Sequence, residues 1–241
     1  MVLSVTHLFI ASPPQWDVYD AVVFDHDGVI VGRTPFDTLR EAAWNAFEQQ
    51  GVSDPDLAHV DDIAVGVDPA TLSDICERYD VDPAEFWRVR DQTAAEAQIA
   101  ASRAGKKTPY DDVDALSHLD AALGVVSSNQ QATVDDLLGH FGLADRFEVV
   151  YGREPSIASL SRKKPSPYYL ERALADLDAS TALFVGDNES DVQAADNAGI
   201  DSAFVRRPHR RETELSTQPT YEIADLHDLV SLCGRTLVGS Q

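Results

Sequence analysis

Hydrophobic residues along the chain gather in short runs that end at polar residues. Runs of about four to eight residues that are rich in Val, Ile and Phe are typical of buried strands. Three such runs are strong and two are weaker; they cover residues 21–25, 123–128, 182–187, 147–152 and 201–207. Helical patterns fill the gaps over residues 111–123, 133–141, 166–177 and 191–198. Strands that alternate with helices predict an α/β fold with a Rossmann-like parallel sheet.

One long segment breaks this alternation, because its apolar residues recur at helical spacing and no stretch of it resembles a strand. The helical patterns cover residues 38–50, 71–79 and 84–104. We therefore predict an all-helical inserted domain over residues 33–107 and a core made of residues 1–32 and 108–241. The chain enters the insertion near Thr34-Pro35 and leaves it over residues 105–109, where glycine and proline suit hinges.

The length of 241 residues and the 44% hydrophobic content suit a core domain with a smaller insertion. No run of about 18 apolar residues is present, so the sequence predicts no membrane-spanning helix. The apolar N-terminal stretch lacks a basic segment ahead of it, which argues against a secretory signal. We expect a cytoplasmic protein with no membrane partner.

The charge balance is strongly acidic. The 41 acidic residues exceed the 19 basic ones and give a net charge of −22, which argues against nucleic acid as a partner. Most of the acids are Asp, and the chain has only four lysines. This composition resembles that of proteins from salt-accumulating organisms, where dissolved cations screen the self-repulsion. A halophilic origin is therefore a hypothesis of the sequence.

Two acids stand at the end of the first predicted strand. Asp25 and Asp27 are two residues apart, so strand alternation projects both carboxylates to the same side. Carboxylates held together repel each other, which indicates a bound cation or a shared proton. Gly28 lets the backbone turn directly after them. An ordinary helix cap or Asx turn would explain the same residues without any chemistry.

Polar residues also follow two other strands and one loop. Ser127 and Ser128 end the second strand, Lys164 precedes a proline, and Asp187 and Asp191 follow the fourth strand. Each has a plain alternative: a helix cap for the serines and Asp191, and a solvated surface residue for the lysine. Because ligands bind at the carboxyl edge of parallel sheets, the set together predicts a site that holds phosphate and a metal.

The four motifs DHDGV, a strand that ends in Ser127, Lys164-Pro165 and GDNESD occur here in this order. In this respect the chain resembles the haloacid dehalogenase superfamily of hydrolases, from about Val18 to the C-terminus. The resemblance implies a Rossmann-like core and a type 1 cap, which is inserted just after the first motif. The predicted helical insertion over residues 33–107 falls at that position.

The resemblance also implies roles for single residues. Asp25 would attack phosphorus and become an aspartyl phosphate, and Asp27 would act as the general acid and base. Ser127, the Ser128 backbone and Lys164 would hold the phosphoryl oxygens. The implied cofactor is Mg²⁺, and its expected protein ligands are the Asp25 carboxylate, the Asp27 backbone carbonyl and the Asp187 carboxylate, with Asp191 as support.

Several neighbouring residues have no role in this scheme. Lys163 is set aside because the lysine of the family directly precedes the proline. His26 replaces the usual apolar residue between the two acids, and strand alternation predicts that it points away from both carboxylates into the core. Val29 stands where many members have Thr, a difference that also occurs among sugar-phosphate enzymes of the superfamily.

The predicted function is the Mg²⁺-dependent hydrolysis of a small phosphate monoester, with phosphoglycolate phosphatase as the default activity that the resemblance implies. A sugar-phosphate phosphomutase is the alternative, because it uses the same motifs. Dehalogenation is disfavoured because Asp27 is present, and a phosphonate hydrolase because Lys106 and Lys107 lie at the insertion exit. A regulatory protein without activity conflicts with the intact motifs. The sequence leaves the oligomeric state open.

Selectivity should lie in the helical insertion and in one basic run. The candidates in the insertion that could face the substrate are Arg33, Phe36, Trp44, Arg88 and Arg90. Residues 206–211 form a basic run in an otherwise acidic chain, after the last predicted strand. This run could attract anionic substrates, or it could be a loop whose charges pair with nearby acids.

Overall fold

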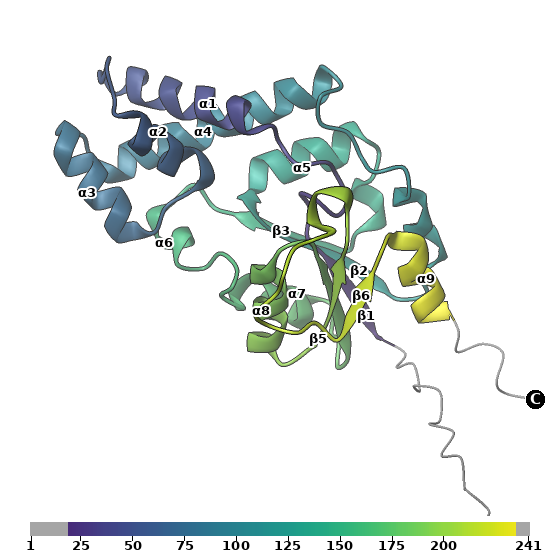
Figure 1. Ribbon diagram of the computed structural model, residues 1–241. Helices are drawn as coiled ribbons and strands as arrows, with labels where there is room; N and C mark the ends of the chain where they lie inside the picture. The colour runs from purple at the N-terminus through teal and green to yellow at the C-terminus, as the bar shows by residue number, and fades with distance from the viewer. Residues whose placement is uncertain (1–18, 235–241) are drawn as a thin grey trace, which may run out of the picture.

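The computed structural model describes residues 19–234, and a six-stranded parallel sheet forms its core (Figure 1). The strand order is β3-β2-β1-β4-β5-β6, so the sheet is doubly wound around its first strand. The strands are β1 (Ala21–Phe24), β2 (Ala122–Gln130), β3 (Val149–Arg153), β4 (Ala182–Gly186), β5 (Asp201–Val205) and β6 (Tyr221–Ile223). The predicted α/β class with a parallel sheet is confirmed. The expectation of no secretory signal falls on residues outside the described range.

Helices cover both faces of the sheet, because neighbouring strand residues point to opposite sides. Val22 and Phe24 pack against α5 and α9, whereas Val23 packs against α7 and α8. All four residues of β1 are buried, which is why its sequence is a continuous apolar run. The bounds of these helices are α5 (Gln131–His140), α7 (Tyr168–Asp176), α8 (Glu189–Ala198) and α9 (Leu226–Gly234).

Four helices lie between β1 and β2 in the chain and gather beside the sheet (Figure 1). They are α1 (Phe36–Gln49), α2 (Leu57–Val65), α3 (Pro69–Tyr79) and α4 (Pro83–Arg103). Phe47, Phe86 and Trp87 belong to an apolar cluster of their own, separate from the two clusters of the sheet. A short helix of the core, α6 (Ile157–Leu160), packs against this cluster through Leu160. The division into domains at residues 33 and 107 stays a prediction.

The two chain segments that connect the sheet to these helices lie side by side. The Gly32 N–H donates to the Thr108 carbonyl at 2.8 Å, and Val31 forms an isolated antiparallel bridge with Pro109. The Tyr110 N–H in turn donates to the Ile30 carbonyl at 3.1 Å. We call these paired segments, residues 30–34 and 106–110, the crossings.

Some elements differ from the sequence prediction. The predicted helix over residues 111–123 is only a 3₁₀-helix over Val113–His118, because the chain must extend again to begin β2 at Ala122. The helix α2 was not expected; it is nine residues long, and the Asp56 side chain caps it by accepting from the Ala58 N–H. The elements α6, β6 and α9 were also missed, since four, three and nine residues give weak periodicity.

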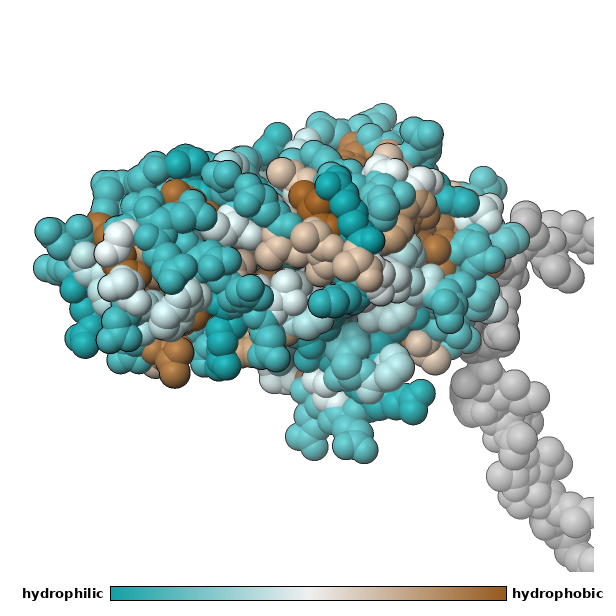
Figure 2. All heavy atoms as spheres, turned by 90° about the horizontal axis from the view of Figure 1, so that it is seen from above, coloured by the Kyte–Doolittle hydropathy of each residue, from teal (hydrophilic) through white to brown (hydrophobic). Residues whose placement is uncertain are grey.

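The outer surface is mostly hydrophilic. Figure 2 shows that hydrophilic residues cover most of the visible face and that hydrophobic groups form only separate patches. None of the helices between residues 19 and 234 combines the length and the apolar character that a bilayer crossing requires.

Candidate active site

The three central strands end at one edge and deliver the predicted site residues there. Phe24 of β1 pairs with Val125 of β2 and with Val185 of β4, so β1 and β4 end within one residue of each other, whereas β2 continues to Gln130. Asp25 and Asp187 therefore leave the sheet at nearly the same height. The Asp25 N–H donates to the Val185 carbonyl at 2.8 Å, which fixes the backbone of the first acid.

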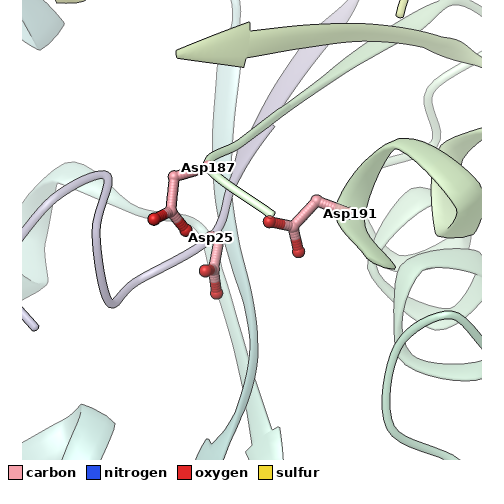
Figure 3. A group of neighbouring side chains, drawn as sticks. All are labelled: Asp25, Asp187 and Asp191. Carbon is pink, nitrogen blue, oxygen red and sulfur yellow. The ribbon is translucent and has the colours of Figure 1, made fainter. Parts of the chain in front are cut away.

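Three carboxylates converge at this edge. Asp25, Asp187 and Asp191 are all buried, and one carboxylate oxygen from each lies within 4.8 Å of the other two. Figure 3 shows the three side chains gathered at this edge. Two glycines make room for them. A Cβ on Gly28, whose φ is +90°, would lie 2.4 Å from Asp187 Oδ2, and a Cβ on Gly186 would lie 2.2 Å from the Asp191 Cβ. The glycines are therefore required by the close approach of the acids.

Asp191 has two tasks at the start of α8. Its Oδ2 accepts from the Asn188 N–H at 2.9 Å, as part of a capping box that begins the helix. Its Oδ1 lies 2.6 Å from the Lys164 ammonium. The helix-cap interpretation and the site interpretation of Asp191 are thus both satisfied by one side chain.

Lys164 links two of the acids. Its ammonium lies 2.7 Å from Asp25 Oδ1 as well as 2.6 Å from Asp191 Oδ1, and only 6% of its side chain is exposed. Burial lowers the pKa of Lys164, but the two carboxylates outweigh burial and raise it. Burial raises the pKa of the Asp25 carboxyl to about 8 against the opposing effect of Lys164, and Asp191 and Asp187 add to the rise.

Asp187 is held by residues that follow β5. The His209 Nε2 atom lies 2.7 Å from Asp187 Oδ2, and the Arg210 Nε lies 3.4 Å from the same oxygen. Neither contact was predicted for the basic run. Elsewhere in that run, Arg206 pairs with exposed Glu222 and Arg207 pairs with buried Asp112, so the interpretation of charges paired with nearby acids describes these positions.

The donor set fits a hard divalent cation. Converging carboxylates supply the oxygen atoms that Mg²⁺ prefers, and they repel one another unless positive charge lies among them. The predicted ligands Asp25 and Asp187 and the predicted support Asp191 are the three members of the cluster. The Asp27 carboxylate is not a member of this cluster, and the metal contact expected of the Asp27 backbone carbonyl stays a prediction.

The Asp27 side chain has separate partners. Its Oδ1 accepts a hydrogen bond from the Lys107 ammonium, and its Oδ2 accepts one from Asn129 Nδ2 at 2.6 Å. Burial raises the pKa of Asp27, but Lys107 and His26 outweigh burial and lower it well below its usual range. Asp25 and Asp27 thus face different lysines, and the expectation that a bound cation or a shared proton joins their carboxylates stays a prediction. The strand ends at Phe24, so alternation does not extend to Asp27.

His26 also departs from its prediction. It is fully buried, as expected, but its Nδ1 lies 3.6 Å from Asp27 Oδ1 instead of pointing away from both acids. The reason is a turn: the Ile30 and Val31 N–H groups both donate to the His26 carbonyl at 3.0 Å. A turn at this position rotates the side chain out of the strand pattern.

The two serines have different surroundings. Ser127 is buried, and its hydroxyl oxygen accepts from the Asn129 N–H at 3.1 Å. Ser128 instead lines a cavity between the sheet and the helices. Lys164 also approaches the carbonyl of Val126, the residue before Ser127, at 3.5 Å. Their predicted contacts with phosphoryl oxygens stay predictions.

This cavity measures about 230 Å³ and reaches from Asp27 and Ser128 to the inner surface of α2 and α4. Its basic lining residues are Arg33, Arg90, Arg153 and Lys163. Arg153 forms a bidentate ion pair with buried Asp91, at 2.6 and 2.8 Å, and Arg90 lies 3.1 Å from the same acid. Lys163 donates to the Val67 carbonyl at 3.2 Å, and burial lowers its pKa.

Of the expected selectivity residues, Arg33 and Arg90 line the cavity. The other three are not among its lining residues. Phe36 is 41% exposed and lies under the Arg40 guanidinium, Trp44 packs against the helical cluster, and Arg88 pairs with exposed Glu85. Trp44 therefore follows the interpretation that a Trp at helical spacing is more often core.

Sequence reasoning missed the residues that surround Asp27. Gln98, Lys107 and Asn129 each contact Asp27 or one of its partners. One signal was available: the chain has only four lysines, and two of them, Lys106 and Lys107, lie together at the exit of the helical insertion. The structure buries Lys107, and a buried lysine is rare unless it is paired, here with Asp27.

Comparisons with known proteins agree with this geometry. The family described as haloacid dehalogenase-like hydrolase matches residues 22–205. The phosphoglycolate phosphatase of Rhodobacter capsulatus is 26% identical over 234 residues, which cover 89% of this chain and 95% of that protein. The pyrophosphatase PpaX of Bacillus velezensis is 31% identical over 131 residues, which cover 53% of this chain and 59% of that protein.

A solved structure supports the fold alone. The crystal structure of CbbY from Rhodobacter sphaeroides in complex with phosphate matches with a TM-score of 0.64 at 19% identity. The match covers 88% of this chain and 96% of that chain.

The chain belongs to the haloacid dehalogenase-like hydrolases, because the family match spans most of its length and includes the strands that carry the site. The predicted superfamily is therefore confirmed. The prediction of an enzyme, a phosphoric monoester hydrolase, is confirmed as well.

Proposed function

We propose that the protein is a Mg²⁺-dependent phosphatase that hydrolyses a small phosphate monoester through an aspartyl phosphate at Asp25. The observation that carries this proposal is the arrangement around Asp25. A buried lysine lies 2.7 Å from its carboxylate, and two further buried acids approach it at the carboxyl edge of the sheet. This arrangement combines a nucleophile, a cation that offsets its charge, and a set of metal ligands.

The metal would be held by the Asp25 and Asp187 carboxylates and the Asp27 backbone carbonyl, with Asp191 in support. Mg²⁺ supplies Lewis acidity that offsets the charge of the phosphoryl oxygens. His209 and Arg210 would keep Asp187 oriented, since both contact its Oδ2.

The chain's own residues perform the remaining steps. An Asp25 oxygen forms a bond to phosphorus while the bond from phosphorus to the leaving oxygen breaks, and Asp27 donates a proton to that oxygen. Because Lys107 and His26 favour the ionised form of Asp27, the negative charge of the bound ester must first raise the pKa of this carboxyl so that it carries the proton. Asp27 then takes a proton from the water that hydrolyses the aspartyl phosphate and regenerates Asp25. Ser127, the Ser128 backbone and Lys164 hold the phosphoryl oxygens during both steps.

The helices α1–α4 serve in this scheme as a cap over the site, with residues 33–107 as the inserted domain. Support comes from the cavity, which has Asp27 and Ser128 on its core side and residues of α2 and α4 on its cap side. A cap in this position would keep bulk water from the reacting phosphoryl group.

The substrate that we propose is a small ester with a second acidic group, with phosphoglycolate as the first to test. The name of the Rhodobacter capsulatus relative supports this choice. The basic side chains in the cavity support it too, because in a chain of net charge −22 they gather where a second anion would lie. Arg90 and Arg153 already pair with Asp91, so Lys163 and Arg33 are the proposed partners of that anion.

A phosphomutase is not favoured, because the named relatives are phosphatases and a pyrophosphatase. A cytoplasmic location and a halophilic origin are parts of the proposal that composition supports, and a small phosphorylated metabolite as the partner is the part that the family resemblance supports. The net charge of −22 supports the halophilic origin.

The test is phosphate release from a panel that contains phosphoglycolate, ethyl phosphate and p-nitrophenyl phosphate, with Mg²⁺ or with EDTA. We expect release only with Mg²⁺, and a kcat/KM for phosphoglycolate at least about 10-fold above that for ethyl phosphate. Lys163→Met should reduce this preference, and Lys106→Met, at an exposed lysine, should not. Equal activity with EDTA, or no release from any ester, would contradict the proposal.

A further inference from the structure

Lys107 has no role in the chemistry proposed above, yet it is only 1% exposed. Its three ammonium hydrogens meet three acceptors: Asp27 Oδ1, Thr34 Oγ1 at 2.9 Å and Gln98 Oε1 at 3.1 Å. Burying a lysine and a carboxylate is costly even when they pair, and an apolar side chain would fill the same space. A buried lysine directed at the proposed acid–base residue therefore calls for an explanation.

The contacts around Asp27 close into a ring. The second carboxylate oxygen accepts from Asn129 Nδ2 at 2.6 Å. Asn129 and Gln98 exchange two further hydrogen bonds, at 2.8 and 3.0 Å. Gln98 then returns to Lys107, so that the ring runs from Asp27 through Lys107, Gln98 and Asn129 back to Asp27. Each carboxylate oxygen of Asp27 has one fixed donor, and the ring thereby fixes the carboxylate plane.

Two links of the ring, from Asp27 to Lys107 and from Asn129 to Gln98, join the sheet edge to the helical insertion. Asp27 and Asn129 belong to the sheet edge, whereas Gln98 lies on α4. Lys107 and Thr34 lie on the two crossings, one on the exit and one on the entry of the cap. Because the crossings are hydrogen bonded to each other, a tilt of the helices about them would move Lys107 relative to Asp27.

We propose that Lys107 is a positioning residue that ties the Asp27 carboxylate to both crossings, so that the orientation of the acid–base group depends on the position of the cap. This inference rests on the proposed function of Asp27. A quarter of the Asp27 side chain is exposed, and the residue lines the cavity, so a leaving group can reach a carboxylate that Lys107 and Asn129 hold in place. In this role Lys107 touches no substrate atom.

The test compares leaving groups. A nitrophenolate leaves without protonation, whereas an ethoxide requires the acid, so misplacement of Asp27 affects ethyl phosphate selectively. We expect Lys107→Met to lower kcat/KM for ethyl phosphate at least about 10-fold more than for p-nitrophenyl phosphate, since small displacements of a catalytic group cost up to about 100-fold. Inhibition by inorganic phosphate should not change. Lys106→Met, at the neighbouring exposed lysine, is the matched control and should leave both esters unaffected.

Thr34→Val is the second variant, because it removes one acceptor of Lys107 with little change in volume. It should lower the same ratio by a smaller factor, about 2-fold to 3-fold, in keeping with the loss of one hydrogen bond. Equal losses for the two esters in both variants would overturn the inference, because they would show a structural role only. An unchanged ratio in both would overturn it as well.

Amide hydrogen exchange tests the same inference without relying on catalysis. We expect Lys107→Met and Asp27→Asn to accelerate exchange in residues 30–34 and 106–110 alike, by at least about 10-fold, because either change opens the ring. Lys106→Met should not do so. Unchanged exchange in both ring variants would show that Asp27 and the crossings are not coupled. Absence of ester hydrolysis by the unaltered enzyme would instead refute the proposed function, so the two failures are distinguishable.

Discussion

Asp25 and Asp27 are two residues apart, and each faces a buried lysine, but their surroundings have opposite effects. Asp25 lies among other acids, and burial raises its pKa; Asp27 lies among donors, and Lys107 and His26 overcome burial and lower its pKa. The partners also come from different regions. Lys164 and Asp187 lie on loops of the core and Asp191 lies at the start of α8. By contrast, Lys107 and Gln98 belong to the crossings and the cap.

This difference shows how two acids of one short motif, Asp25 and Asp27, can have different functions. The Asp25 region is built at strand ends, so the register of the sheet fixes its distances. The Asp27 region connects two parts of the molecule, so its geometry can change when the cap moves. A nucleophile benefits from the first kind of environment, and an acid–base group that must act only on bound substrate benefits from the second.

The largest expected effect is that of Asp25→Asn. Loss of the nucleophile should reduce kcat for p-nitrophenyl phosphate at least about 10³-fold, as removal of a covalent nucleophile generally does. The fold should persist, because Lys164 keeps Asp191 as a partner. The measurement is phosphate release together with a urea unfolding curve. Activity within 10-fold of the unaltered enzyme would contradict the assignment of Asp25 and favour a different nucleophile.

The stability of this variant tests the environment of Asp25 separately. A folded-state pKa above the unfolded value of 3.8 means that the ionised carboxyl opposes folding, and that this penalty grows as pH rises from about 4 to about 8. Without metal at neutral pH, Asp25→Asn should therefore be at least as stable as the unaltered protein. A clear loss of stability at pH 7 would contradict the raised pKa.

Asp27→Asn should have the next largest effect. We expect a loss of about 10²-fold in kcat/KM for ethyl phosphate and a smaller loss for p-nitrophenyl phosphate. Its stability should fall by about 2–3 kcal/mol, because Lys107 stays buried without a carboxylate. This loss contrasts with Asp25→Asn, which keeps an acid beside its lysine. Equal stability of the two variants in urea would remove the distinction between the two regions.

The affinity for Mg²⁺ should depend on pH in a way that reports on Asp25 and Asp191. Burial raises the pKa of both carboxyls, so protons compete with the metal for them. The dissociation constant should therefore fall as pH rises from 6 to 8, by about 10-fold or more if one proton is displaced. Titration calorimetry in two buffers measures both the affinity and the proton release. An affinity that is constant over this range would show that both acids are already ionised without metal.

The smallest expected effect concerns the surface and not the site. A net charge of −22 destabilises the folded state by self-repulsion, which dissolved cations screen. Raising KCl from low to molar concentration should increase the free energy of unfolding by about 1–2 kcal/mol, since many weak surface terms add. Thermal unfolding against KCl measures this gain. No gain would count against the halophilic interpretation and leave the account of the site unchanged.

The sheet could be predicted because its strands are buried on both faces. The run that forms β1 contains no polar residue, so its bounds are clear in the sequence. Because β1 ends at Phe24, Asp25 lies at the sheet edge. The convergence of Asp25 with Asp187 followed from two strands that end within one residue of each other in a parallel sheet, a consequence of topology. By contrast, α2 was missed because nine residues carry too little periodicity.

The surroundings of Asp27 could not be predicted in the same way. Strand alternation ceased to apply after Phe24, so His26 lies beside Asp27 instead of pointing away from it. Lys107 and Gln98 reach Asp27 only because the two crossings pair with each other, and this contact joins residues 80 positions apart in the chain. Patterns in a single sequence report on residues that are close in the chain, so they do not predict a contact between residues this far apart.

The central claim is that Asp25 becomes phosphorylated during turnover, and chemical trapping tests it most directly. The enzyme is mixed with Mg²⁺ and p-nitrophenyl phosphate, quenched in acid and treated with borohydride, which reduces an aspartyl phosphate to homoserine. Peptide mass spectrometry then locates the modified residue. The account predicts homoserine at position 25 and none in Asp25→Asn. Homoserine at another aspartate, or turnover with no trapped residue in repeated early quenches, would contradict it.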